Sequence, residues 1–214
     1  MQTEHTKILT AAAREVLKPL GLVQKGRSRT WIADHGWWVV LVEFQPSAWS
    51  RGSYLNVGAM WLTYPLDHLV FHDGHREHAF EPFEEADQFR SVAEGLARLA
   101  AKKVEALRGR LATVAGAYQR QESILADQRT RQLWSLYYTA SFAALAGDAA
   151  RATYLAEEIA AKEVTRDWEH EAKRVSAATF SAASPVAAIK AHTVATCNSL
   201  KLGNAEVTGL DAAA

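Results

Sequence analysis

Apolar residues near the start of the chain recur at the spacing of an α-helix. The residues of this repeat are Leu9, Ala13, Val16 and Leu20. They form one apolar face, which predicts a helix over about residues 5–18. Pro19 and Gly21 follow and end it, because proline lacks the backbone donor and glycine adopts the turn readily.

After this helix the period shortens to two, which is the repeat of a β-strand. Four strands are predicted, over residues 22–24, 28–33, 37–45 and 53–63. Trp38, Val42 and Phe44 fall on one face of the third strand, and Glu43 and Gln45 fall on the other. We expect an antiparallel meander with the first helix packed on one face and the helical half of the chain on the second face.

The second half of the chain is rich in alanine, with 29 alanines in residues 101–214 against 11 in residues 1–100. Its apolar residues step by three and four, which predicts helices. These are expected over residues 89–121, 126–146, 148–162 and 166–181, with a last helix from Ser184. Asp148 and Ser184 are predicted to cap the N-termini of their helices. The fold class is therefore α+β, an antiparallel sheet with one helix followed by an all-helical region packed on it.

The same pattern divides the chain into a sheet domain over residues 1–88 and a helical region over residues 89–202. Residues 203–214 are small and polar and are expected to fray. Within the helical region, residues 129–162 resemble one tetratricopeptide-like hairpin. The chain has no 34-residue self-similarity, so an ordinary helical hairpin is the alternative.

Charge and composition exclude several classes of protein. Lys and Arg number 24 and Asp and Glu also 24, so no broad positive surface for nucleic acid or a membrane is expected. The first residues lack the apolar core of a secretory signal, so none is expected, and no long apolar run is present. The one cysteine, Cys197, needs no oxidising compartment. These features predict a cytoplasmic protein that binds neither nucleic acid nor membrane.

The common catalytic and cofactor motifs are missing. The sequence has no glycine-rich nucleotide loop, zinc-protease, esterase or paired-cysteine motif. No cofactor is therefore expected. The sequence favours a protein without catalytic activity, but whether it is an enzyme stays open.

Four of the eight histidines lie close together, at His68, His72, His75 and His78. Imidazole and the neighbouring carboxylates are good ligands for zinc, manganese or iron. Gly74 indicates a turn in the middle of this segment, which would break a regular ligand set. A polar loop with solvated histidines is the favoured interpretation, and a metal site is the alternative.

A second candidate site lies on the predicted sheet. Glu43, Gln45 and Asn56 are expected on one face, with Arg29 on the neighbouring strand. Polar groups on an apolar sheet either satisfy one another or bind a ligand. Both readings stay open at this point.

Arg29 also belongs to a basic triplet with Lys25 and Arg27. Such a triplet can hold a phosphate or an acidic partner. The acidic stretch over residues 81–87 can instead neutralise it within the fold.

Three short segments carry a resemblance to a known family. They read LVQKGRSRTW over Leu22–Trp31, FQPS over Phe44–Ser47 and LNVG over Leu55–Gly58. Residues 5–110 thereby resemble a bacterial domain-of-unknown-function family, numbered four-three-zero-four, although leucine stands where the family often has phenylalanine and the helical half is longer. The resemblance implies an α+β fold and no activity, and Gln45, Ser47 and Asn56 match the family's polar motif positions.

Three functions are compatible with these observations. The first is a non-catalytic binding module for a protein or peptide partner. The second is a small metal-dependent hydrolase that uses the segment His68–His78. The third is a small-ligand pocket between sheet and helices, with Glu43, Gln45 and Asn56 in its lining. The sequence leaves the partner and the oligomeric state open.

Overall fold

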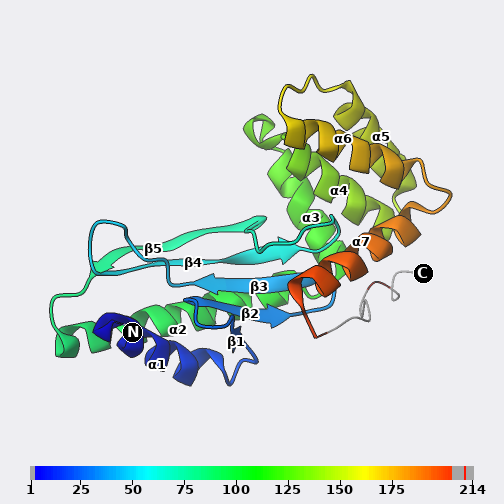
Figure 1. Ribbon diagram of the computed structural model, residues 1–214. Coiled ribbons are helices and arrows are strands. Elements are labelled where there is room, and N and C mark those ends of the chain that lie inside the picture. The colour runs from blue at the N-terminus through cyan, green and yellow to red at the C-terminus, as the bar shows by residue number, and fades with distance from the viewer. Residues whose placement is uncertain (1–2, 204–209, 211–214) are drawn as a thin grey trace. The chain divides into compact units, whose positions relative to one another are not determined.

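The computed structural model describes residues 3–203 and residue 210, and it has the predicted α+β arrangement. One helix precedes an antiparallel sheet along the chain, and the remaining helices follow the sheet (Figure 1). Across the described residues no strand follows residue 82, so the prediction of a helical second half is confirmed. Except for Gly203 and Leu210, the predicted frayed tail over residues 203–214 lies outside the described residues.

The chain forms two compact units. The sheet unit comprises Met1–Met60 and Leu69–Gly109, and the helical unit comprises Trp61–His68 and Arg110–Ala214. The long helix after the sheet therefore belongs to the sheet unit, and the two units do not divide at the predicted boundary between residues 88 and 89.

Five strands in sequence order make the sheet. They are β1 (Val23–Gln24), β2 (Thr30–Asp34), β3 (Trp38–Glu43), β4 (Gly52–Trp61) and β5 (Asp73–Pro82). The bounds of the first four lie within two residues of the predicted strands. Trp31 pairs with Val42 and Ala33 with Val40, so the bulky residues of β2 and β3 share one buried face.

The fifth strand corrects the sequence analysis, which placed a loop with a turn at Gly74. Gly74 instead lies in β5 and pairs with Gly58 of β4. A Cβ atom on Gly58 would lie 2.6 Å from the Cα atom of Gly74, closer than packed atoms approach. The two glycines therefore allow two backbones to approach closely, which is the other structural use of glycine in a strand.

Helices α1 (Glu4–Leu17) and α2 (Ala86–Arg110) pack on the sheet face that carries Phe44. On α1, His5 reaches the guanidinium of Arg29, whose backbone pairs with that of Phe44. On α2, Lys103 forms an ion pair of 2.6 Å with Glu77 of β5. Alternation along the strands places Glu77 on the same face as Phe44, so both helices cover that one face.

The helical unit contains α3 (Val114–Leu125), α4 (Leu133–Leu145), α5 (Ala149–Ala161), α6 (Asp167–Phe180) and α7 (Pro185–Leu200), with a short 3₁₀ turn at Gln128–Thr130. The predicted single helix over residues 89–121 was wrong. It breaks between α2 and α3, where the Thr113 hydroxyl accepts a hydrogen bond from the Gly116 backbone and starts a new helix. The predicted caps at Asp148 and Ser184 are confirmed by hydrogen bonds of 3.0 and 3.2 Å from the first turns of α5 and α7.

Candidate functional site

The structure brings together three of the predicted site residues on the sheet. The amide nitrogen of Asn56 donates to Oε2 of Glu43 and to Oε1 of Gln45, both at 2.9 Å. Arg76 of β5, which the sequence analysis did not single out, donates to the same Gln45 oxygen at 2.9 Å. We call these four residues the polar cluster.

The members of the polar cluster satisfy one another. Both hydrogens of the Asn56 amide are used, and the Arg76 guanidinium lies 3.9 Å above the centre of the Tyr54 ring. Tyr54 in turn packs on Phe80, with ring centres 5.1 Å apart. The cluster lies on the face away from α1 and α2, so it does not line the predicted pocket between sheet and helices, and its geometry favours a structural role.

Arg29 does not join this cluster, which corrects its predicted place. Its backbone carbonyl accepts from the amide of Phe44, so Arg29 shares the face of Phe44 rather than that of Glu43. Its side chain points to the N-terminal end of α1. There it lies at the rim of a hollow of about 390 Å³ at one end of the sheet unit.

This hollow, which we call the arginine hollow, is lined by Thr3, His5, Arg29 and residues 46–52. Ser47, a predicted site residue, belongs to its lining and lies apart from the polar cluster. The Ser47 hydroxyl accepts from the backbone of Trp49 at 3.1 Å, which shapes the loop between β3 and β4. The sequence-predicted residues are thus divided between a closed cluster and an open hollow.

Neutral groups hold the Arg29 side chain in place. Nη1 donates to the Gly52 carbonyl at 3.1 Å, and Nη2 donates to Nε2 of His5 at 2.8 Å and to the Thr6 hydroxyl at 2.7 Å. No described carboxylate forms an ion pair with Arg29, so the acidic stretch over residues 81–87 does not neutralise it. Burial lowers the pKa of Arg29, because its charge is partly desolvated and lacks a counter-charge.

A second guanidinium, that of Arg51, makes the arginine hollow electropositive. Arg51 is exposed on its rim, and within the described chain its side chain has neither an ion pair nor a hydrogen bond. The pKa of His5 is lowered by burial and then by the charges of Arg29 and Arg51. His5 is therefore neutral at physiological pH and accepts the hydrogen bond from Arg29, leaving two uncompensated guanidinium charges around one concave surface.

Trp49 was not singled out by the sequence analysis. It is 94% exposed and lines the arginine hollow. Tryptophan is among the costliest side chains to leave in water and is enriched in the centres of binding interfaces. Its position in a polar loop between Pro46 and Gly52 is the sequence signal that separates it from the strand tryptophans.

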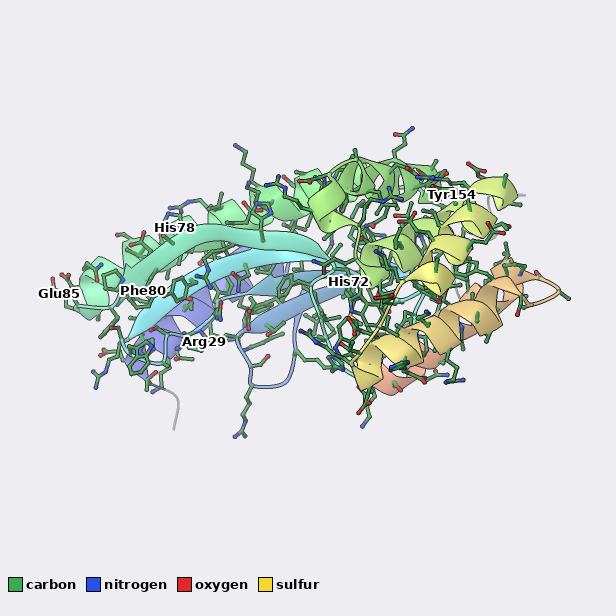
Figure 2. The ribbon with its side chains drawn as sticks, turned by 90° about the horizontal axis from the view of Figure 1, so that it is seen from above. Arg29, His72, His78, Phe80, Glu85 and Tyr154 are labelled. Carbon is green, nitrogen blue, oxygen red and sulfur yellow. The ribbon has the colours of Figure 1, made fainter. Side chains whose placement is uncertain are left out.

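The four histidines of the candidate metal site are spread over separate places. His72 and His78 lie far apart along the sheet unit (Figure 2), and His68 belongs to the helical unit. His68, His75 and His78 each lie within 3.4 Å of a carboxylate, on Asp67, Glu77 and Glu81 respectively. Among the residues that the structure describes, no three histidine, cysteine or acidic side chains gather in a metal-binding group.

Comparison with known proteins adds no assignment. No family model matches the sequence, and no curated protein and no solved structure matches it either. Within the described ranges, no helix combines the length and the apolar composition that a membrane span requires.

Proposed function

We propose that the protein is a non-catalytic binding module and that the arginine hollow receives an anionic group of a partner protein or peptide. The observation that carries the proposal is the partly buried guanidinium of Arg29, which has only neutral partners and borders a concave surface. Desolvating a charge without an opposite charge is costly, and a bound anion offsets that cost.

The surroundings of Arg29 favour a protein partner over a nucleic acid. Exposed tryptophan and arginine side chains, here Trp49 and Arg51, are the residues that most often dominate binding energy at protein interfaces. A nucleic-acid surface needs a long basic stripe, whereas this chain is neutral overall. The resemblance to the domain-of-unknown-function family and the cytoplasmic location stay predictions beside this proposal.

The alternative functions have weaker support. A metal-dependent hydrolase needs three converging ligands, and His72 and His78 do not converge (Figure 2). A second hollow, of about 300 Å³, lies between β5 and α2, and its lining includes His78 with Glu81. That hollow brings together a histidine and a carboxylate only 3.4 Å apart, which already satisfy each other.

Fluorescence anisotropy with labelled hexaglutamate and hexalysine peptides tests the proposal. We expect hexaglutamate to bind with an affinity that falls as the salt concentration rises from 50 to 200 mM, because salt at about 0.1 M screens exposed charges that lie more than about 10 Å apart. Arg51→Met should weaken this binding at least about fivefold, as expected for one lost charge pair. Arg98→Met is the matched control, because Arg98 is an exposed arginine of the same unit whose ion pair is with Glu94 on its own helix.

The proposal is wrong if hexaglutamate binds no better than hexalysine. It is equally wrong if the two arginine variants bind hexaglutamate alike. The Arg51 side chain has no hydrogen bond or ion pair to lose within the described residues, so a folding defect is not expected, and circular dichroism of both variants checks this.

A further inference from the structure

We infer that the group received by the arginine hollow is a phosphate monoester on a side chain of the partner. This inference rests on the proposed function and narrows it from any anion to a doubly charged one. It follows from the number of uncompensated charges, the donors that remain available and the position of Trp49.

Charge balance is the first argument. Arg29 and Arg51 bring two positive charges to one hollow, and no described carboxylate pairs with either of them. A carboxylate neutralises one of these charges. A phosphate monoester carries about −1.5 to −2 at pH 7 and neutralises both.

The unused donors around the hollow are the second argument. A guanidinium has five N–H groups, and Arg29 uses three of them on Gly52, His5 and Thr6. Two N–H groups therefore remain on a side chain that its other contacts already hold in place. The Ser47 hydroxyl accepts from the Trp49 backbone and still has its own hydrogen to donate.

These donors come from separate parts of the chain, one just before β2 and the other in the loop before β4. Phosphate has three terminal oxygens that accept in three directions, whereas a carboxylate accepts within one plane. Donors from two separate segments around one concave surface are satisfied better by the tetrahedral group.

Trp49 is the third argument, and it favours a phosphorylated protein over a free phosphate ion. An indole that is 94% exposed at the rim offers a flat apolar surface beside the charged hollow. Inorganic phosphate has no carbon atoms that could pack on the indole. A phosphorylated side chain brings its own carbon atoms and those of neighbouring residues, which can cover the indole.

Three peptides of one sequence test the inference, carrying phosphotyrosine, sulfotyrosine or tyrosine at the central position. Sulfotyrosine has the shape of phosphotyrosine but a single negative charge, so the pair separates charge from shape. We expect the phosphotyrosine peptide to bind at least about tenfold more tightly than the sulfotyrosine peptide, as expected for a second charge-assisted contact. Arg51→Met should reduce that ratio to about two, because one of the two positive charges is gone.

Trp49→Ala provides an independent variant, since this exposed side chain has little folding role. It should weaken binding of the phosphotyrosine peptide at least about fivefold and leave the affinity for inorganic phosphate, measured by competition, unchanged. Arg98→Met again serves as the control.

The outcomes separate this inference from the proposed function. Equal binding of the phosphotyrosine and sulfotyrosine peptides would overturn the phosphate assignment and leave an anion-binding module in place. Tighter binding of inorganic phosphate or of adenosine monophosphate than of the phosphopeptide would overturn the assignment to a protein partner. Failure of both the modified peptides and hexaglutamate to bind would overturn the inference together with the proposed function.

Discussion

Replacing Asn56 should show that the polar cluster stabilises the sheet and is not a ligand site. Asn56→Ala removes two hydrogen bonds of 2.9 Å, one to the carboxylate of Glu43 and one to the amide oxygen of Gln45. A bond to a charged group contributes about 1.5–3 kcal/mol and a neutral bond about 0.5–1.5 kcal/mol. Because the cluster is only partly buried, water replaces part of the lost hydrogen bonding. We therefore expect the free energy of unfolding to fall by about 1–2 kcal/mol.

Asn56→Asp is the sharper variant, because it also places a second carboxylate beside Glu43. Two like charges about 4 Å apart repel by roughly 1 kcal/mol in bulk water and by roughly 4 kcal/mol near a protein surface. Arg76 pairs across the strands with position 56 and attracts the new charge, so the expected additional loss at pH 7 is about 1 kcal/mol. At pH 4 protonation of the introduced aspartate removes this repulsion and lets its hydroxyl donate a hydrogen bond to Glu43, so the difference in stability between the two variants should narrow.

Hydrogen exchange measured on peptides of β3 and β4 is the suitable assay, since it reports on the sheet unit alone, and urea unfolding at pH 7 and pH 4 complements it. Asn56→Ala should bind the phosphotyrosine peptide as the unmodified protein does, because the polar cluster lies apart from the arginine hollow. The reasoning fails if Asn56→Ala costs less than about 0.5 kcal/mol, below the weakest of the two lost bonds. It also fails if the variant folds normally and loses peptide binding, since the cluster would then belong to the binding site.

Two further perturbations probe the sheet unit. Gly58→Ala should destabilise it by about 2 kcal/mol or more in urea unfolding, because the added Cβ would lie 2.6 Å from the Cα atom of Gly74. Gly95→Ala on α2 is the control: its Cβ meets no atom within 4 Å, so it should stabilise the unit by about 0.5–1 kcal/mol in the same titration. The pKa of His35 is lowered by burial and then by the charge of Arg108, so the folded state binds fewer protons than the unfolded state and stability should be full above about pH 6.5 and decline as the pH falls below it. His35→Gln should make that decline shallower in melting curves recorded from pH 8 to pH 5, and an unchanged slope would contradict the assignment.

Much of the local structure of this protein can be predicted from its sequence. The helical repeat before Pro19 gives α1, and the alternation through β3 places Gln45 on the opposite face from Phe44. The caps at Asp148 and Ser184 form where the sequence indicates them. These features depend on neighbours within about one helical turn or one strand, so periodicity and capping chemistry suffice to predict them.

Pairing between distant segments decided the rest. β5 lacks a clear apolar alternation, and its glycine acts as a spacer only because Gly58 lies opposite it. The strand register brought Arg76 into the polar cluster and took Arg29 away from it, to the far face and toward His5. A side chain's face follows from its own strand, but its partners follow from which residue of another strand lies beside it, and only the assembled sheet fixes that choice.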